Sequence, residues 1–338
     1  MISSHTLELA IEMDREAFEK LKGEARNRDN YDRATEKDYA LIKNGITVWY
    51  HRTEFKRKIK LLVNPNRMLG YNDLVKLWKP SRKNISKLLN GLEESIDKYF
   101  GSRYRLNDFT LTRIDFTKNL HLAENSRVSA YIKVLNNIKK VKGFSPKYGK
   151  GDRWYDYDAG FDLEGNSNGV VFTAYDKEAA IKSEEKESEM EYRKKERKAR
   201  LASAEGLLRI EVKLTTQKAI RQYTDKNNAA MRIADLSEKS EQIFFDTFRK
   251  VVPFGDFYKK DKATEIIQEN ILNKTTRRKM LELVDLIPKK KSLHLAQKEM
   301  GDRNMERIME TFARLNLSPV SISKRQEVRY LPNMYSLI

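Results

Sequence analysis

The sequence predicts an α+β protein, in which an antiparallel sheet with helices on one face is followed by an all-helical C-terminal domain. Two observations support this fold class. Segments in which apolar and polar residues alternate recur up to residue 214, as in strands. Beyond about residue 225 the apolar residues recur every three or four positions, as in helices. We therefore expect one domain over residues 1–224 and a second over residues 225–338.

Strands and helices alternate in the first hundred residues of the predicted sheet domain. Asp14 is a suitable N-cap for the first helix, Pro65 cannot donate to a sheet, and Gly101 ends the third helix. The predicted elements are a strand over 6–12 with Leu7, Leu9 and Ile11 inward, a helix over 14–21, a loop over 26–37, two strands within 39–63, a short helix over 73–78 and an amphipathic helix over 84–100.

The rest of the sheet domain contains three more alternating segments. Strands are predicted over 109–117, 170–175 and 207–214, and helices over 126–139 and 176–204. The Gly-rich stretch 143–169 is a turn-heavy connection or a hairpin arm. Five helices follow, over 241–251, 263–272, 275–286, 292–300 and 304–315, with interruptions at 253–255 and at Pro288, and residues 318–338 form a strand or a tail.

Charge is the strongest global property of the chain. Lys and Arg number 67 against 49 acidic residues, which gives a net charge of +18. This excess favours a polyanionic partner, nucleic acid first and an acidic membrane surface second. The absence of cysteine excludes disulfides, zinc–thiolate sites and cysteine nucleophiles. The N-terminal residues do not form a signal peptide, and no apolar run is long enough to cross a membrane, so we expect a soluble, cytoplasmic protein.

Three of the predicted strands carry apolar residues on one face and reactive polar residues on the other. The polar sets are Arg113, Asp115 and Thr117; Thr173, Tyr175 and Lys177; and Arg209, Glu211 and Lys213. An exposed sheet face with ordinary cross-strand ion pairs would show the same pattern, and Tyr175 would then be a strand tyrosine with a solvated hydroxyl. Neighbouring strands would instead bring Asp115, Tyr175 and Glu211 into one patch.

Such a patch has a definite chemistry. Two close carboxylates repel each other unless a cation lies between them, and oxygen ligands suit Mg²⁺ or Mn²⁺. The ion would polarise a phosphodiester and help to ionise Tyr175, which is a weak nucleophile at neutral pH. Lys177, Arg113 and Arg209 would hold the phosphate groups of DNA. The sequence thus contains the parts of a metal-dependent phosphodiester-cleaving site with a tyrosine nucleophile.

Other motifs are weaker. The four histidines are scattered and show no metal-binding spacing, and there is no Gly-rich phosphate loop. Trp154, Tyr155 and Tyr157 follow Arg153 and would either stack on unpaired bases or pack locally. Residues 289–315 resemble a helix-turn-helix without its strict spacing, and a generic helical bundle explains them equally well.

The order of these motifs carries a family resemblance. LTRIDFT, VVFTAYDKE, a charged helix and GLLRIEVKL follow one another, after KIKLLVNPNRMLGYND upstream. This series resembles the replication proteins of the filamentous-phage gene II type and the related Rep_trans plasmid initiators. The similarity extends from Ile59 to Tyr223.

The resemblance implies a function for the first domain. Members of the family nick one DNA strand at an origin with a tyrosine, remain attached through a 5′-phosphotyrosyl bond, and leave a 3′-hydroxyl as primer for rolling-circle replication. By position, Tyr175 matches the nucleophile, Asp115 and Glu211 match the metal ligands, and Lys177 matches the lysine after the tyrosine. The first domain would then be a Rep-like nicking and joining domain.

The expected function is therefore initiation of rolling-circle replication of a phage or plasmid by a metal-dependent nickase and strand transferase. Its partners would be single- and double-stranded DNA at an origin, with a host helicase or polymerase and a second copy of the chain as further candidates, and no membrane. The residues expected to contact DNA are Arg113, Arg153, Trp154, Arg209 and Lys213. The helical domain would bind the origin duplex or act as an accessory. A conjugative or mobilisation relaxase, a non-catalytic DNA- or RNA-binding regulator and a structural RNA-associated protein are the alternatives.

Overall fold

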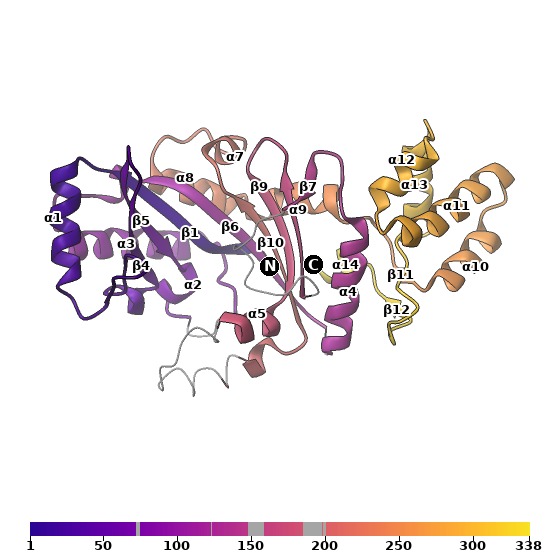
Figure 1. Ribbon diagram of the computed structural model, residues 1–338, viewed down its shortest axis with the longest axis horizontal. Helices are drawn as coiled ribbons and strands as arrows, with labels where there is room; N and C mark the ends of the chain where they lie inside the picture. Colours follow the sequence, from indigo (N-terminus) through magenta and orange to yellow (C-terminus); the bar gives the residue numbers. More distant parts are fainter. Residues whose placement is uncertain (72–74, 123, 148–158, 185–197, 199–200) are drawn as a thin grey trace. The chain divides into compact units, whose positions relative to one another are not determined.

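The computed structural model describes residues 1–71, 75–122, 124–147, 159–184, 198 and 201–338. The chain forms two compact units, each assembled from separate stretches of sequence and each containing both strands and helices (Figure 1). Unit 1 consists of Met1–Lys118, Asn168–Val170 and Val212–Phe244, and unit 2 of Asn119–Ser167, Val171–Glu211 and Phe245–Ile338. The functional division predicted at residue 224 stays a prediction.

Unit 1 is built on antiparallel strands in the order β2-β3-β4-β5-β1-β6. The predicted strand over 6–12 is confirmed and is longer. Leu61 of β5 lies opposite Leu9 of β1 and Val48 of β4, so apolar side chains meet across the three central strands. The strands are β1 (Ser3–Glu12), β2 (Tyr31–Asp32), β3 (Lys37–Asp38), β4 (Ile46–Arg52), β5 (Arg57–Val63) and β6 (Thr110–His121).

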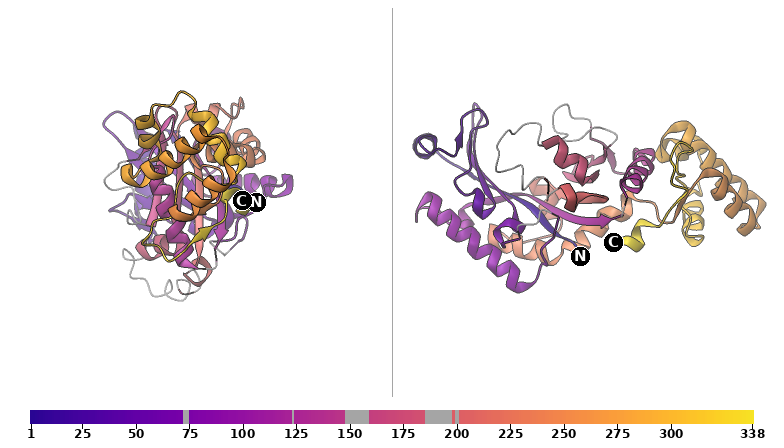
Figure 2. Two further views of the ribbon diagram at one scale, coloured as in Figure 1. Left: turned by 90° about the vertical axis from the view of Figure 1, so that its right-hand side faces the viewer. Right: turned by 90° about the horizontal axis from the view of Figure 1, so that it is seen from below.

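One face of these strands forms the core of unit 1, because alternate residues of β1, β4 and β5 are buried against helices. Tyr50 of β4 packs edge-on against Phe18 of the first helix and hydrogen-bonds Tyr99 of α3. Helix α3 runs along this side of the strands (Figure 2). The helices of the unit are α1 (Arg15–Arg26), α2 (Pro65–Met68), α3 (Arg82–Phe100), α7 (Gln217–Arg221) and α8 (Ala229–Glu238), with short 3₁₀ turns at Ile42–Asn44 and Leu106–Asp108.

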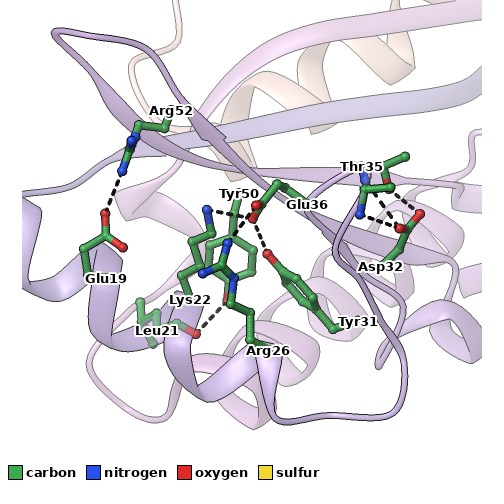
Figure 3. A network of polar contacts seen from close by, with 11 residues as sticks. Glu19, Leu21, Lys22, Arg26, Tyr31, Asp32, Thr35, Glu36, Tyr50 and Arg52 are labelled. Atoms are coloured by element: carbon green, nitrogen blue, oxygen red, sulfur yellow. Dashed lines mark hydrogen bonds and ion pairs between the residues drawn. The ribbon is translucent and has the colours of Figure 1, made fainter.

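A polar network fixes α1 to the β2–β3 hairpin (Figure 3). The Glu36 carboxylate accepts contacts from Lys22 at 2.7 Å, from Arg26 at 2.9 Å and from the Tyr31 hydroxyl. The Tyr50 hydroxyl also lies 3.2 Å from a backbone carbonyl oxygen of α1. The hairpin overlaps residues 26–37, which the sequence predicted to be a loop. It was missed because these side-chain contacts, rather than hydrophobic alternation, hold the two short strands in place.

Unit 2 contains strands in the order β10-β9-β8-β7, with helices packed on them. Asn136 of α4 donates to the carbonyl oxygen of Gly160 in β8, and Phe172 of β9 packs on Phe248 of α9. The strands are β7 (Phe144–Pro146), β8 (Gly160–Gly165), β9 (Val170–Asp176) and β10 (Leu207–Leu214), and the helices are α4 (Asn125–Ile138), α5 (Lys177–Glu184), α9 (Ser240–Val251) and α14 (Met334–Leu337). β7 and β8 pair as the hairpin arm predicted for 143–169.

The C-terminal part of unit 2 is helical, as predicted. Its helices are α10 (Lys260–Asn270), α11 (Lys274–Lys290), α12 (Leu293–Met300) and α13 (Met305–Arg314). Two details differ from the prediction: Pro288 lies inside α11 instead of interrupting it, and the strand β11 (Phe257–Tyr258) was not predicted. β11 pairs with β12 (Tyr330–Leu331), which confirms the strand that was one of the two alternatives for residues 318–338.

Three further predictions were incomplete or wrong, and each has a local reason. The helix predicted over 73–78 is absent from its described residues, 75–78, where Asn66 instead accepts a hydrogen bond from the backbone of Trp78. The helices α7 and α8 were missed, although Thr216 and Asn228 cap them. Most of the helix predicted over 176–204 lies outside the described residues, and only α5 is described at its start. Within the described parts of the chain, no helix is both long and apolar enough for a membrane span.

Candidate active site

Strand β9 places Tyr175 in unit 2. Phe172 and Ala174 alternate with Thr173 and Tyr175, as the period of two predicts, and Phe172 packs on α9. The Tyr175 side of the strand was expected to be open to solvent. This expectation is wrong, because Thr173, Tyr175 and Lys177 are only 3%, 6% and 6% exposed. Both faces of β9 are therefore covered.

The Tyr175 hydroxyl donates a hydrogen bond to Oε1 of Glu211 at 2.9 Å. The two residues are 36 positions apart in sequence and come from β9 and its neighbour β10. The Lys177 ammonium lies 6.0 Å from the centre of the Tyr175 ring. The structure therefore brings together three of the residues that the sequence singled out, within one unit.

Arg209 completes this cluster from the same face of β10 as Glu211. Its side chain is fully buried, and its Nε donates to the amide oxygen of Asn119 at 2.9 Å. Burial and the Glu211 carboxylate raise the pKa of the Tyr175 hydroxyl well above its usual value, while Arg209 lowers it by its charge and by a hydrogen bond. We refer to Tyr175, Glu211, Arg209 and Lys177 as the tyrosine cluster. It holds a proton acceptor and a cation at one phenol.

Asp115 lies on β6 in unit 1, opposite Thr6 of β1. Its buried carboxylate receives Nε and Nη2 of Arg113 at 2.8 and 2.5 Å, a two-point contact within one strand. The buried hydroxyls of Thr117 and Ser3 have no hydrogen-bond partner among the described residues. Thr117 is two positions from Asp115 on β6, and Ser3 lies directly opposite Thr117.

Asp115 and Thr117 carry oxygen atoms that are relevant to the predicted divalent cation. Mg²⁺ is commonly held by one or two carboxylates, with waters and substrate phosphates completing its shell. Among the described residues there is no group of three or more His, Cys, Asp and Glu side chains that would form an all-protein cage. Asp115 with the unpartnered Thr117 hydroxyl nevertheless offers hard oxygen donors on one strand face, which is the chemistry that such an ion requires.

Three other residues were predicted to contact DNA. Lys213 is half-buried on β10, in the part of the strand that belongs to unit 1. Arg153 and Trp154 lie outside the described residues. Sequence reasoning missed Thr117 as an unpartnered hydroxyl and Asn119 as the residue that positions Arg209. The signal was available, because residues 115, 117 and 119 share one face of a strand.

A comparison with protein families identifies the family of the chain. The family model Phage_CRI, which describes the N-terminal part of a replication-associated protein, matches residues 66–234, half of the 338-residue chain. The class of protein is thus a replication-associated protein with an α+β fold. The chain belongs to the Phage_CRI family, which supports a role as a replication initiator that acts on DNA at an origin. No curated protein is significantly similar to the chain in sequence.

Proposed function

We propose that the protein nicks and rejoins origin DNA with Tyr175 as its nucleophile. The observation that carries the proposal is the hydrogen bond from the Tyr175 hydroxyl to Glu211, made in a buried site beside Arg209. A phenol needs a proton acceptor to become a nucleophile, and a nearby cation stabilises the phenolate. The family membership supplies the substrate class, DNA at a replication origin.

In the forward reaction, Glu211 accepts the Tyr175 proton while the phenol oxygen attacks the phosphorus atom of a phosphodiester. The bond from phosphorus to the 3′ oxygen breaks, and that oxygen takes a proton from solvent to become a 3′-hydroxyl. The 5′ phosphate remains attached to Tyr175. Rejoining is the reverse reaction, in which a 3′-hydroxyl attacks the phosphotyrosyl bond and Glu211 returns the proton to the phenol. Lys177 and Arg209 supply positive charge for the phosphate oxygens.

A divalent cation is part of the proposal. Of the two carboxylates to which the sequence points, Asp115 and Glu211, we assign the ion to Asp115 in unit 1, where Thr117 offers an additional oxygen. When bound, such an ion polarises the phosphate and neutralises its developing charge. Arg113 orients the Asp115 carboxylate through its two-point contact.

Tyr175 is only 6% exposed, so the DNA strand must gain access to its hydroxyl before attack. A coupled opening of this kind is common at sites that sequester a reactive group from water. DNA binding and cleavage of the phosphodiester are then separate steps, and both are to be measured.

The test is formation of a covalent protein–DNA adduct. Wild-type protein is incubated with end-labelled single-stranded origin DNA and Mn²⁺ and analysed on a denaturing gel. We expect an adduct that Tyr175→Phe abolishes. Tyr131→Phe is the matched control, because Tyr131 is also a buried tyrosine of unit 2 whose hydroxyl bonds an oxygen, here the carbonyl of Pro332 at 2.6 Å.

Other outcomes contradict the proposal. An adduct that survives in Tyr175→Phe assigns the nucleophile to another tyrosine, with Tyr148, Tyr155 and Tyr157 next in line. Tight DNA binding without an adduct in any divalent cation supports a non-catalytic regulator, whose charged residues only contact backbone phosphates.

A further inference from the structure

The β4–β5 hairpin of unit 1 carries an aromatic and basic surface that the tyrosine cluster does not use. It precedes the family-matched segment, which begins at residue 66. One face of the hairpin is core, with Ile46, Val48 and Tyr50 buried. The other face is only half-buried and presents the alternate residues Thr47, Trp49, His51, Lys58 and Lys60.

Trp49 is the centre of this second face. Lys37 of β3 and Lys60 of β5 lie opposite it in the register, with their ammonium groups 5.8 and 5.0 Å from the indole. The His51 ring lies 5.2 Å away, edge-on. A flat π surface flanked by lysines is the combination with which proteins bind single strands, since bases stack on the ring and phosphates contact the cations.

Phe55 provides a second aromatic group at the tip of the same hairpin. It is 85% exposed, between the exposed residues Arg52 and Lys56. The turn does not depend on it, because Thr53 closes the tip by backbone and hydroxyl contacts with Lys56. Phe55 thus contributes little to folding, while a base stacked on it would cover exposed apolar surface.

The half-buried face continues toward Asp115 within unit 1. The Lys60 ammonium lies 3.1 Å from Glu8 of β1, and Glu8 lies opposite Arg113 of β6. Because β4, β5, β1 and β6 are successive neighbours, Trp49 and Arg113 are about 15 Å apart. A strand held on Trp49 would therefore reach Arg113 and Asp115 within a few nucleotides.

We propose that this surface, formed by Trp49, His51, Phe55, Lys37 and Lys60, is a binding site for single-stranded DNA. Unpaired bases stack on Trp49 and Phe55, and Lys37 and Lys60 contact the adjoining phosphates. This inference rests on the proposed function. It adds a site that binds the DNA strand which Tyr175 is proposed to nick. Single-stranded DNA is the occupant because only unpaired bases expose a face to an aromatic ring.

The experiment measures equilibrium binding of the full chain to a fluorescein-labelled oligothymidylate of about 20 nucleotides. Tyr175→Phe is the background and EDTA is present, so that no cleavage occurs. We expect Trp49→Ala and Phe55→Ala each to weaken binding about tenfold, and Trp49→Phe to retain most of the affinity. Lys37→Gln and Lys60→Gln should each lower the slope of log affinity against log salt by about 0.7.

The control for Phe55→Ala is Leu272→Ala, which removes an apolar side chain that is 90% exposed in unit 2. It should bind like the parent. Thermal melts of all variants show whether a loss of binding reflects unfolding, and Phe55→Ala keeps the test valid if Trp49→Ala does not fold. Unchanged affinity in the folded alanine variants would overturn the proposal, as would tighter binding to duplex DNA or to RNA of the same sequence.

This result is separable from the test of Tyr175. If wild-type protein forms the adduct but the hairpin variants bind the oligonucleotide normally, only the hairpin site is wrong. If the hairpin variants lose affinity but no adduct forms, the single-strand site stands and the nicking chemistry is wrong.

Discussion

Each unit contains a tyrosine hydroxyl that donates to a buried carboxylate, and the two pairs differ in where the positive charge acts. In unit 1 the Tyr99 hydroxyl donates to Asp38 at 2.6 Å, and Arg28 bonds the same carboxylate oxygen at 2.8 Å. Burial, Tyr50 and Asp38 all raise the pKa of Tyr99. In unit 2 burial and Glu211 likewise raise the pKa of Tyr175 well above its usual value, but Arg209 opposes them.

This difference is consistent with a structural role for the first pair and with the proposed catalytic role for the second. The other oxygen of Asp38 accepts the backbone N–H of Ala40, so the carboxylate in unit 1 is bonded on both oxygens. The Arg28 guanidinium also lies 4.4 Å from the centre of the Tyr99 ring. Such a network favours one arrangement and keeps the phenol protonated. In the tyrosine cluster Arg209 acts on the phenol itself and opposes part of the rise in the pKa of Tyr175 that burial and Glu211 cause.

The largest expected difference between the Tyr175–Glu211 and Tyr99–Asp38 pairs is in the rate of adduct formation. Glu211→Gln should slow adduct formation by about 100- to 10,000-fold, because an amide cannot accept the Tyr175 proton. Asp38→Asn should leave the rate within a few-fold of wild type under conditions in which it is folded. Single-turnover assays with labelled origin DNA and Mn²⁺ measure both rates. A wild-type rate in Glu211→Gln would mean that another group takes the proton.

The second prediction concerns stability, and here the larger effect is expected at the Tyr99–Asp38 pair. Asp38→Asn should lower the free energy of unfolding by about 2 kcal/mol, since it leaves the Arg28 charge without its buried partner. Glu211→Gln should cost less, because the amide oxygen of Gln can still accept the Tyr175 hydroxyl, whereas Asp38 accepts hydrogen bonds on both of its oxygens. Urea denaturation of both variants measures the difference. Equal losses would show that the Tyr175 pair is as structural as the Tyr99 pair.

The third prediction concerns the acid limit of the network around Glu36 (Figure 3). Burial alone would raise the pKa of Glu36, but hydrogen bonds from Lys22, Tyr31 and Arg26 outweigh it and lower the pKa to about 2. A carboxyl whose pKa is lower in the folded state stabilises the fold above its unfolded pKa of about 4.5, and this stabilisation is lost as the pH falls toward 2.

Glu36→Gln should remove that part of the pH dependence. After allowance for solvent screening, the contribution is on the order of 1 kcal/mol. Urea denaturation at pH 7 and near pH 3 compares the variant with wild type. The variant should be the less stable protein at pH 7, with the gap narrowing in acid. A constant gap would mean that the Glu36 contacts do not depend on its charge.

The smallest expected effect concerns the unpartnered hydroxyl beside Asp115. Thr117→Val replaces it with a methyl group of the same shape, so stability should be unchanged or slightly higher. If the hydroxyl helps to hold the divalent cation, the Mn²⁺ concentration for half-maximal adduct formation should rise several-fold. Titration of Mn²⁺ in the adduct assay measures this. An unchanged titration would remove Thr117 from the metal site.

Local patterns predicted most of the elements, because they depend on residues close in sequence. Helix α4 matches its predicted span within one residue at each end, and β10 matches it fully. The hairpin of β2 and β3 was missed because contacts of Glu36 with Lys22 and Tyr31, rather than an alternating pattern of residues, stabilise it. Pro288 was expected to interrupt the helices, but α11 continues past it to Lys290.

The candidate site likewise has a part that could be predicted from the local sequence and a part that depends on tertiary contacts. Tyr175 and Glu211 could be selected from the sequence because each stands on the polar side of an alternating strand beside basic residues. Their hydrogen bond could not be derived, because it depends on how two strands 36 positions apart align. The contact of Asn119 with Arg209, 90 positions away, depends equally on strand alignment.

By itself the sequence determined the elements, the face of each strand that carries the reactive side chains, and the family to which they point, because periodicity and motif order are local properties. The tertiary structure alone decided that Tyr175 is buried, that Glu211 accepts its hydrogen bond and that Arg209 lies beside it. Burial and proton affinity depend on what covers a side chain. That covering comes from segments distant in the sequence, brought together by packing.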